Sequence, residues 1–352
     1  MKMPSPNRFK ELFQEVQAEH KQTSTFSLND KVLIVDGHNN YLRNFCAVPT
    51  MNEMGEHVGG VSGFLKSIGS AIRMFRPTRC IITFDGPGGS QRRRKLYPEY
   101  KENRKHLTRL NRTYDFKDKD DEDKALTWQL IALAHLLKCL PVTVLAPSNV
   151  EADDVIAYTA DLIQQRDGHS IIMSTDKDFL QLVNEHIEIW NPIKKKAYYP
   201  QTVIDEYGIH PNNFTVYRAL DGDKSDNISG VKGIGLKTLI KHYPTLVNEE
   251  MMDVNALIDY AERQDKGKLF ESIRRNRDLI ELNFKLMNLH QVQMSTSTKM
   301  SVMNRIDSAN FELNKTELTK QLAELQMLGV FGNYDAWILN TWHPLIRFSN
   351  KE

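Results

Sequence analysis

Carboxylate side chains recur at comparable places in this sequence, after apolar runs, at the start of helical patterns and in turns. Glu151 and Asp154 are three residues apart at the start of a helical pattern, so they share one face. Asp176 and Asp178 are two residues apart, which turns both to the same side of an extended chain. A single acidic residue in such a place is usually a helix cap or a turn residue. The full set is Asp36, Asp85, Glu151, Asp153, Asp154, Asp176, Asp178, Asp223 and Asp226.

The set as a whole predicts a metal site. Two unit charges about 4 Å apart repel by roughly 4 kcal/mol at an effective dielectric of about 20, so converging carboxylates require cations. Hard oxygen ligands without nearby His or Cys favour Mg²⁺ and allow Mn²⁺ in its place. Two such ions suit the in-line attack of water on a phosphodiester, one activating the water and the other stabilising the leaving oxygen.

Alternating apolar runs and helical patterns indicate how these carboxylates would be positioned. Continuous apolar runs predict buried strands, and helical spacing between them predicts an α/β fold with a mostly parallel central sheet flanked by helices. Functional sites in such sheets gather beyond the carboxyl ends of the strands. Asp36, Asp85 and Asp176 end three of the runs, so we expect them at one edge. The expected strands are 31–36, 79–86, 141–146, 170–176 and 187–191, and the expected helices are 61–75, 125–139 and 150–165.

The remainder of the chain divides by its pattern of polar and apolar residues. Residues 1–30 form a polar N-terminal extension with apolar side chains at helical spacing at Phe9, Leu12, Phe13 and Val16, which we expect to pack on the body rather than bind a partner. From Pro200 onward the pattern becomes short helices. The predicted units are the extension 1–30, an α/β domain 31–199 with an insertion at about 88–124, a C-terminal helical domain 200–340 and a tail 341–352.

A basic segment follows Asp85 directly. Residues 91–112 carry nine Lys or Arg against two Glu, with Tyr97 and Tyr100 between them. Basic residues follow phosphates and exposed tyrosines stack on bases, although a basic run is more often a solvated helix face. Its position beside the carboxylates favours nucleic-acid binding. Residues 114–124 then turn acidic, with six Asp or Glu against three Lys, and we expect a loop leading into the helix at Ala125.

A glycine-rich turn at 230–235 lies between predicted helices and resembles a helical hairpin whose backbone N–H groups hold duplex phosphates. Two other motif interpretations fail. The segment from Asp221 begins like an EF-hand loop, but its sixth residue is Asp226 and its twelfth is Lys232. A P-loop fails because Leu236 separates the second glycine from Lys237.

Composition indicates an ordinary globular protein. The 352 residues are 40% hydrophobic and 26% charged, with a net charge of +1. No apolar run could span a bilayer, which predicts no membrane association. The three scattered cysteines indicate reduced thiols in a cytoplasm.

In order, these segments resemble the 5′-nuclease superfamily, which includes flap endonucleases, phage 5′-exonucleases and the 5′-nuclease domain of bacterial repair polymerases. The matching segments are IVDG (34–37), TFDG (83–86), YPEYKENR (97–104), VEADDVIA (150–157), STDKDFLQLV (174–183) and ALDGDKSDNISGVKGIGLKT (219–238). The resemblance implies a Mg²⁺-dependent phosphodiesterase acting on 5′ flaps, nicks, 5′ ends and RNA–DNA hybrids such as RNA primers. It also implies a free-standing, phage-like monomer and a replication-protein partner.

The resemblance further implies roles for individual residues. Two metal groups are expected, the first formed by Asp36, Asp85, Glu151, Asp153 and Asp154 and the second by Asp176, Asp178, Asp223 and Asp226. By the same resemblance, 31–199 is the nuclease domain, its insertion at about 88–124 is a helical arch, and 200–340 is a duplex-binding domain. In the arch, Lys101 and Arg104 match residues that contact the scissile phosphate. The turn at 230–235 matches a helix-turn-helix variant that holds the downstream duplex, often with K⁺. Residues assigned to DNA contact are Arg92, Arg93, Arg94, Lys95, Tyr97, Tyr100, Lys105, Gly230, Lys232, Gly233, Gly235 and Lys237.

The chain departs from the family pattern at Thr175, where many relatives have Gly, and at Asp221, an added carboxylate that we assign to no metal. Two alternative functions stay open at this point. A non-catalytic DNA-junction binder of the same fold would lack some carboxylates, and none is missing. The sequence separates a DNA-directed nuclease poorly from an RNA-directed nuclease of the same fold, because the inferred contacts are to phosphates and to the shape of the nucleic acid.

Overall fold

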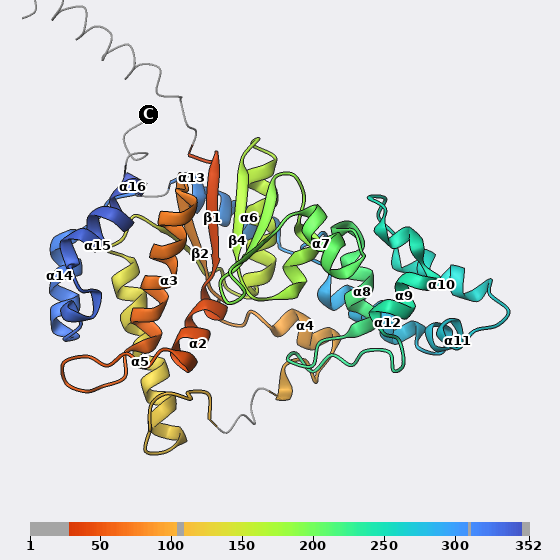
Figure 1. Cartoon of the computed structure of the whole chain (residues 1–352), viewed down its shortest axis with the longest axis horizontal. Helices are drawn as coiled ribbons and strands as arrows, with labels where there is room; N and C mark the ends of the chain where they lie inside the picture. The colour runs from red at the N-terminus through yellow and green to blue at the C-terminus, as the bar shows by residue number, and fades with distance from the viewer. Residues whose placement is uncertain (1–27, 104–108, 309–310, 347–352) are drawn as a thin grey trace, which may run out of the picture.

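A computed structural model describes residues 28–103, 109–308 and 311–346 (Figure 1). Predictions made for Arg104, Lys105, residues 1–27 and the last six residues of the tail lie outside the described residues. No helix in the described ranges is long and apolar enough to cross a membrane.

The centre of the fold is a six-stranded sheet of order β3-β2-β1-β4-β5-β6. All neighbouring strands run parallel except β5 and β6, which confirms the predicted mostly parallel α/β sheet. The strands are β1 (Lys31–Asp36), β2 (Arg79–Thr83), β3 (Thr143–Leu145), β4 (His169–Met173), β5 (Ile187–Asn191) and β6 (Lys196–Tyr198). Asp36 ends β1 as expected, but Asp85 and Asp176 lie in the loops that follow β2 and β4.

Helices cover both faces of the sheet because alternate residues of β1 point to opposite sides. Leu33 and Val35 belong to a core with α3 (Gly59–Phe75) and α5 (Lys119–Leu137). Val32 and Ile34 belong to a second core with α6 (Ala152–Gln164) and α13 (Thr296–Asp307). The first core also takes in the closing helices α14 (Lys315–Glu324), α15 (Tyr334–Thr341) and α16 (His343–Ile346), at the left of Figure 1.

Short helices form a separate core on the far side of the sheet's carboxyl edge, to the right in Figure 1. They are α8 (Phe214–Asp221), α9 (Leu236–His242), α10 (Val254–Glu262), α11 (Lys268–Arg275) and α12 (Arg277–Met287). The preceding helix α7 (Pro200–Tyr207) packs its Val203 into the second core of the sheet. Two further short helices, α2 (Gly37–Ala47) and α4 (Gln91–Leu96), follow β1 and β2. The carboxylate sites therefore lie between the sheet and this helical unit.

The acidic run at 114–124 was expected to be a loop, and that expectation is wrong for its second half. α5 begins at Lys119, with Asp118 as its N-cap accepting from Asp121 N. Acidic residues are stabilised in a first helical turn by the helix dipole. Glu122 is fully buried and its Oε1 accepts from Leu110 N and Asn111 N over 2.9 and 2.6 Å. The run therefore anchors the chain where it returns from the predicted arch.

Candidate metal centre

Two carboxylates of the first group lie at the end of β1 and in the loop that follows β2. Asp36 Oδ1 accepts from Asn39 N at the start of α2, and its Oδ2 accepts from Ser174 Oγ over 2.8 Å. Asp85 Oδ1 accepts from Ala152 N over 2.7 Å, which joins the β2 loop to the start of α6. Strand ends and helix starts thus bring residues 36, 85 and 152 together, as parallel β–α units do.

Glu151 and Asp154 stand at the start of α6 with the guanidinium of Arg93 between them. Arg93 Nη1 donates to Glu151 and, over 2.7 Å, to Asp154 Oδ2. Lys101 Nζ donates to Glu151 Oε1 over 2.6 Å and lies 3.9 Å from Asp226 Oδ2. Arg93 is 4% exposed and Lys101 is 9% exposed. The segment after β2 therefore brings two buried cations to the first group.

Arg218 on α8 joins carboxylates of the second group. Its Nε donates to Asp178 Oδ1 over 2.5 Å and its Nη2 to Asp223 Oδ2 over 2.7 Å. Its Nη1 donates to Asp221 Oδ2 and Gly222 O over 3.1 and 2.9 Å. Asp178 lies in the 3-10 helix η2 (Lys177–Leu182) that follows β4. One buried guanidinium therefore ties the sheet to the helical unit.

Further hydrogen bonds hold Asp176, Asp223 and Asp226 of the second group. Asp176 caps η2 by accepting from Asp178 N over 2.8 Å. Asp223 Oδ1 accepts from both the N–H and the hydroxyl of Ser225 over 2.7 Å. Tyr100 OH donates to Asp226 Oδ2 over 3.0 Å. Asp176 and Asp223 are thus oriented by their own loops, and Asp226 by a residue of the segment after β2.

A cavity of about 500 Å³ connects the two groups. It lies at the carboxyl end of the parallel strands, and Lys101 and Arg43 are on its wall. Carboxylates from both groups line it, together with the side chain of Ser225. They are Asp36, Asp85, Asp153, Asp176 and Asp226.

Mutual repulsion and burial shift the pKa values of these acids upward. Burial, and then the charges of Asp176 and Asp85, raise the pKa of Asp36 to about 7. Burial, and then the charge of Asp178, raise the pKa of Asp176 to about 7. Burial also raises the pKa of Asp153. Unneutralised negative charge therefore concentrates where a cation would sit.

Glu151 shows the opposite shift. Burial alone would raise its pKa, but Arg93 and Lys101 hold the pKa of Glu151 at about 2. Asp223 also has a lowered pKa, because the Ser225 hydrogen bonds and Arg218 outweigh burial. Within the described ranges no three His, Cys, Asp or Glu side chains are grouped to hold one ion. Several of the carboxylates are instead paired with Arg93, Lys101 and Arg218.

The residues assigned to DNA contact fall into two sets. Arg93 and Tyr100 are buried at the base of the segment after β2, where both contact Glu151. Arg94 and Lys95 are exposed on α4, while Arg92 and Tyr97 are partly exposed. Because Arg93 and Tyr100 are buried against Glu151, they can orient its carboxylate. Their contact with DNA stays a prediction.

The glycine turn lies between α8 and α9, as the sequence pattern predicts. Gly233 has a φ of +83°, a conformation that favours glycine. A Cβ at Gly233 or Gly235 would meet no atom within 4 Å, so this backbone is open for close approach. Lys232 and Lys237 flank it and are exposed. Gly230 differs, because it packs against the backbone of Asp221.

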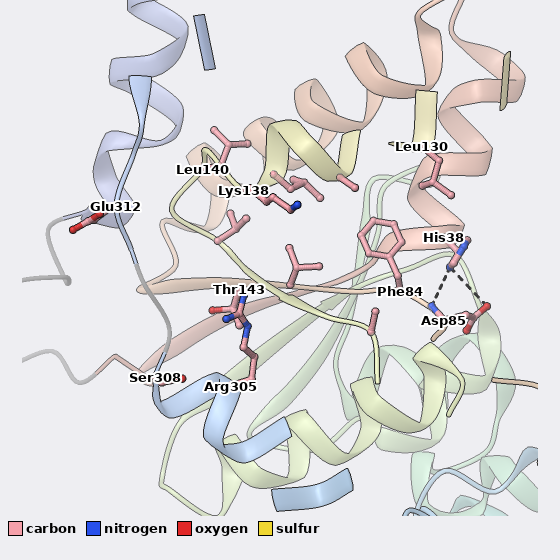
Figure 2. Close-up of a pocket in the computed structure, with 15 residues that line it drawn as sticks. His38, Phe84, Asp85, Leu130, Lys138, Leu140, Thr143, Arg305, Ser308 and Glu312 are labelled. Carbon is pink, nitrogen blue, oxygen red and sulfur yellow. Dashed lines mark hydrogen bonds and ion pairs between the residues drawn. The ribbon is translucent and has the colours of Figure 1, made fainter. Parts of the chain in front are cut away.

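Sequence reasoning missed three residues that the tertiary structure brings to the site. Arg218 precedes Asp221 by three residues, a helical spacing that was the signal for it. Ser174, the first residue after the neighbouring strand β4, donates a hydrogen bond to Asp36. His38 Nδ1 accepts from Asp85 N over 3.1 Å and lies 3.7 Å from Asp85 Oδ2 (Figure 2). Nothing in the local sequence pairs residues 36 and 174 or 38 and 85.

Two family models match the chain. Residues 31–208 match the 5′-3′ exonuclease N-terminal resolvase-like domain, and residues 209–309 match the 5′-3′ exonuclease C-terminal SAM fold. The chain is a member of the 5′-3′ exonuclease family. It is therefore a nuclease, and the predicted resemblance is confirmed.

Relatives and solved structures agree with this assignment. The 5′-3′ exonuclease of Aquifex aeolicus is 30% identical over 309 residues, covering 86% of this chain and 94% of the relative. Flap endonuclease Xni of a Shewanella species is 32% identical over 263 residues, covering 74% and 90%. The bacteriophage T5 flap endonuclease has the same fold, with a TM-score of 0.61 and 20% identity over 84% of this chain and 99% of the phage protein.

Proposed function

We propose that this family member is a structure-selective, metal-dependent 5′-nuclease that hydrolyses phosphodiesters near 5′ ends, flaps and RNA primers. The cavity between the two carboxylate groups carries the proposal, because it places Lys101 opposite carboxylates from both groups. The phage T5 relative was crystallised with DNA and metal ions, which supports the same ligands here.

The residues present fit divalent cations. The donor set is carboxylate oxygen throughout, the raised pKa values mark uncompensated charge, and Arg93, Lys101 and Arg218 neutralise only part of it. We assign Mg²⁺, with Mn²⁺ as a substitute, to two groups. The first is Asp36, Asp85, Glu151, Asp153 and Asp154, and the second is Asp176, Asp178, Asp223 and Asp226. When bound, the ions supply Lewis-acid stabilisation of the attacking and leaving oxygens.

The chain's own residues bind and orient the substrate in this proposal. Exposed Arg94 and Lys95 contact the 5′ single strand, and the open turn around Gly233 holds the downstream duplex, with K⁺ as a candidate ligand there. Lys101 turns from Glu151 to the scissile phosphate and stabilises the charge that develops on it. Fraying of the end base pairs, at a cost of a few kcal/mol, lets that phosphate reach the cavity. The products are a 3′-hydroxyl and a 5′-phosphate.

One assay tests the proposal. A 5′-labelled flap, a nicked duplex, a blunt duplex and an RNA–DNA hybrid are incubated with the enzyme and Mg²⁺, with matched samples in EDTA. We expect cleavage near the 5′ end of the flap and the nick, and none in EDTA. Binding without cleavage in Mg²⁺ or Mn²⁺ would leave the junction-binder alternative, and cleavage of RNA alone would leave the RNA-directed one.

A further inference from the structure

A second cavity, of about 690 Å³, follows the open edge of the sheet (Figure 2). It lies along β3, which pairs with β2 on one side only, and between α5 and α13. Its walls are mainly apolar. The apolar residues are Leu130, Ala134 and Leu137 of α5, with Leu140, Val142, Val144 and Ala146 around the strand. Exposed apolar surface of this extent is typical of a site that another polypeptide segment covers.

The two ends of the groove differ in charge. His38, Phe84 and Asp85 lie at the end near the carboxylates, where Phe84 points into the groove (Figure 2). Lys138, Arg305 and the carboxylate of Glu312 lie toward the opposite end, the amino end of the strands. Neither of these two cations has an ion-pair partner among the described residues. Two cations against one carboxylate give the distal end a net positive charge, which suits an acidic group.

The described chain begins beside this cationic end. Leu28 O accepts from Thr78 Oγ1 over 2.9 Å, and Asn29 Oδ1 accepts from Arg79 Nη1 over 3.1 Å. The same guanidinium donates to Ile306 O over 2.7 Å. Ile306 is the residue after Arg305, so one side chain links the start of the described chain to the wall of the groove.

The residues before this point match the groove in apolar spacing, length and charge. Phe9, Leu12, Phe13 and Val16 would share one face of a helix. From Phe9 to Val16 such a helix rises about 10 Å, the same as α5 from Leu130 to Leu137, because both pairs are seven residues apart. The acidic residues Glu11, Glu15 and Glu19 follow at four-residue intervals beside that face.

We propose that residues 9–19 dock as an amphipathic helix in the groove between α5, β3 and α13, with Glu19 at the Lys138–Arg305 end and Phe9 at the Phe84 end. The connection imposes this direction, since residue 28 lies at the cationic end. The nine steps from Glu19 to Leu28 can span up to about 30 Å, which is enough to enter the groove without strain. The segment thereby covers the sheet's open edge, a position that native proteins protect.

Photo-crosslinking in the full-length protein tests the proposal. Phe9, Val16 or Gln14 is replaced, one at a time, by p-benzoylphenylalanine, and the links formed on illumination are mapped by mass spectrometry. The probe at Phe9 should link within the same chain to the region of Phe84 and Leu130. The probe at Val16 should link to the region of Leu140 and Arg305. The probe at Gln14, on the polar face, should form no link to the groove.

A variant that blocks the groove provides the second part of the crosslinking experiment. Ala134 is exposed in the groove wall, so Ala134→Glu should preserve the fold and abolish both links. His135→Glu, on the neighbouring exposed position outside the groove, should leave them unchanged. Links between two chains, links to another surface, or links that survive Ala134→Glu would overturn the proposal. Equal melting temperatures for the two variants establish that the loss is local.

Discussion

The two carboxylate groups differ in where their counter-cations come from. The first group lies at the sheet edge and the start of α6, and its cations, Arg93 and Lys101, come from the segment after β2. The second group is shared between η2 and the loop after α8, and its cation, Arg218, lies on α8 and pairs with Asp178 and Asp223. Charge balance in the first group therefore depends on the base of the predicted arch, and in the second on the docking of the helical unit.

The largest expected effect is from Asp223→Asn, which removes a charge from the second group. Loss of about 4 kcal/mol of transition-state stabilisation corresponds to a roughly 1000-fold slower cleavage. DNA binding should change little, because the exposed turn around Gly233 is untouched. Flap cleavage and flap affinity are measured side by side. Asp221→Asn is the matched control, since we assign Asp221 to no metal, and equal loss in both variants would contradict the assignment.

In the first group, Lys101→Ala should slow the chemical step by about 100-fold, because a cation that stabilises developing charge is lost. Single-turnover cleavage of a pre-bound flap measures that step without product release. Lys95→Ala, an exposed cation on α4, should weaken binding without slowing this rate. An unchanged single-turnover rate for Lys101→Ala would refute its proposed role.

Arg218→Met tests whether the Arg218 guanidinium is the counter-charge of the second carboxylate group. Its removal leaves Asp178 and Asp223 without their counter-charge, and we expect the free energy of unfolding to fall by about 3 kcal/mol in EDTA. Mg²⁺ should restore more stability to this variant than to the wild type. Urea unfolding with and without Mg²⁺ measures both. Arg263→Met, an exposed position in the same helical unit, is the control, and equal responses would remove Arg218 from the site.

The smallest expected effect is a pH dependence of the stability of the folded state, which originates in both carboxylate groups. The pKa of Asp36 and of Asp176 is raised from 3.8 to about 7, so the folded state binds extra protons between those values. This contribution to stability is present below about pH 4 and is lost as pH rises towards 7. The increase in Tm on adding Mg²⁺ should therefore be larger at pH 8 than at pH 5.5. In Asp36→Asn the difference between the two pH values should shrink, and an unaltered difference would exclude Asp36 as a source.

Sequence patterns predicted the sheet well because buried parallel strands are short apolar runs, and the predicted strand 187–191 coincides with β5. Strand ends were less accurate, since Asp85 and Asp176 lie in loops beyond β2 and β4. The acidic run was mistaken for a loop because the burial of Glu122 depends on Leu110 and Asn111, which contact it only after the chain folds back.

The sequence by itself determined the acids, their local spacing on helix starts and loops, and the family to which the chain belongs. Hydrophobic periodicity and residue type are local properties, so they can be recognised along the chain. Only the tertiary structure decided which cation meets which carboxylate. Arg93 reaches Asp154 across 61 positions and Arg218 reaches Asp178 across 40. Such pairings depend on how separate elements pack, and no local pattern encodes that packing.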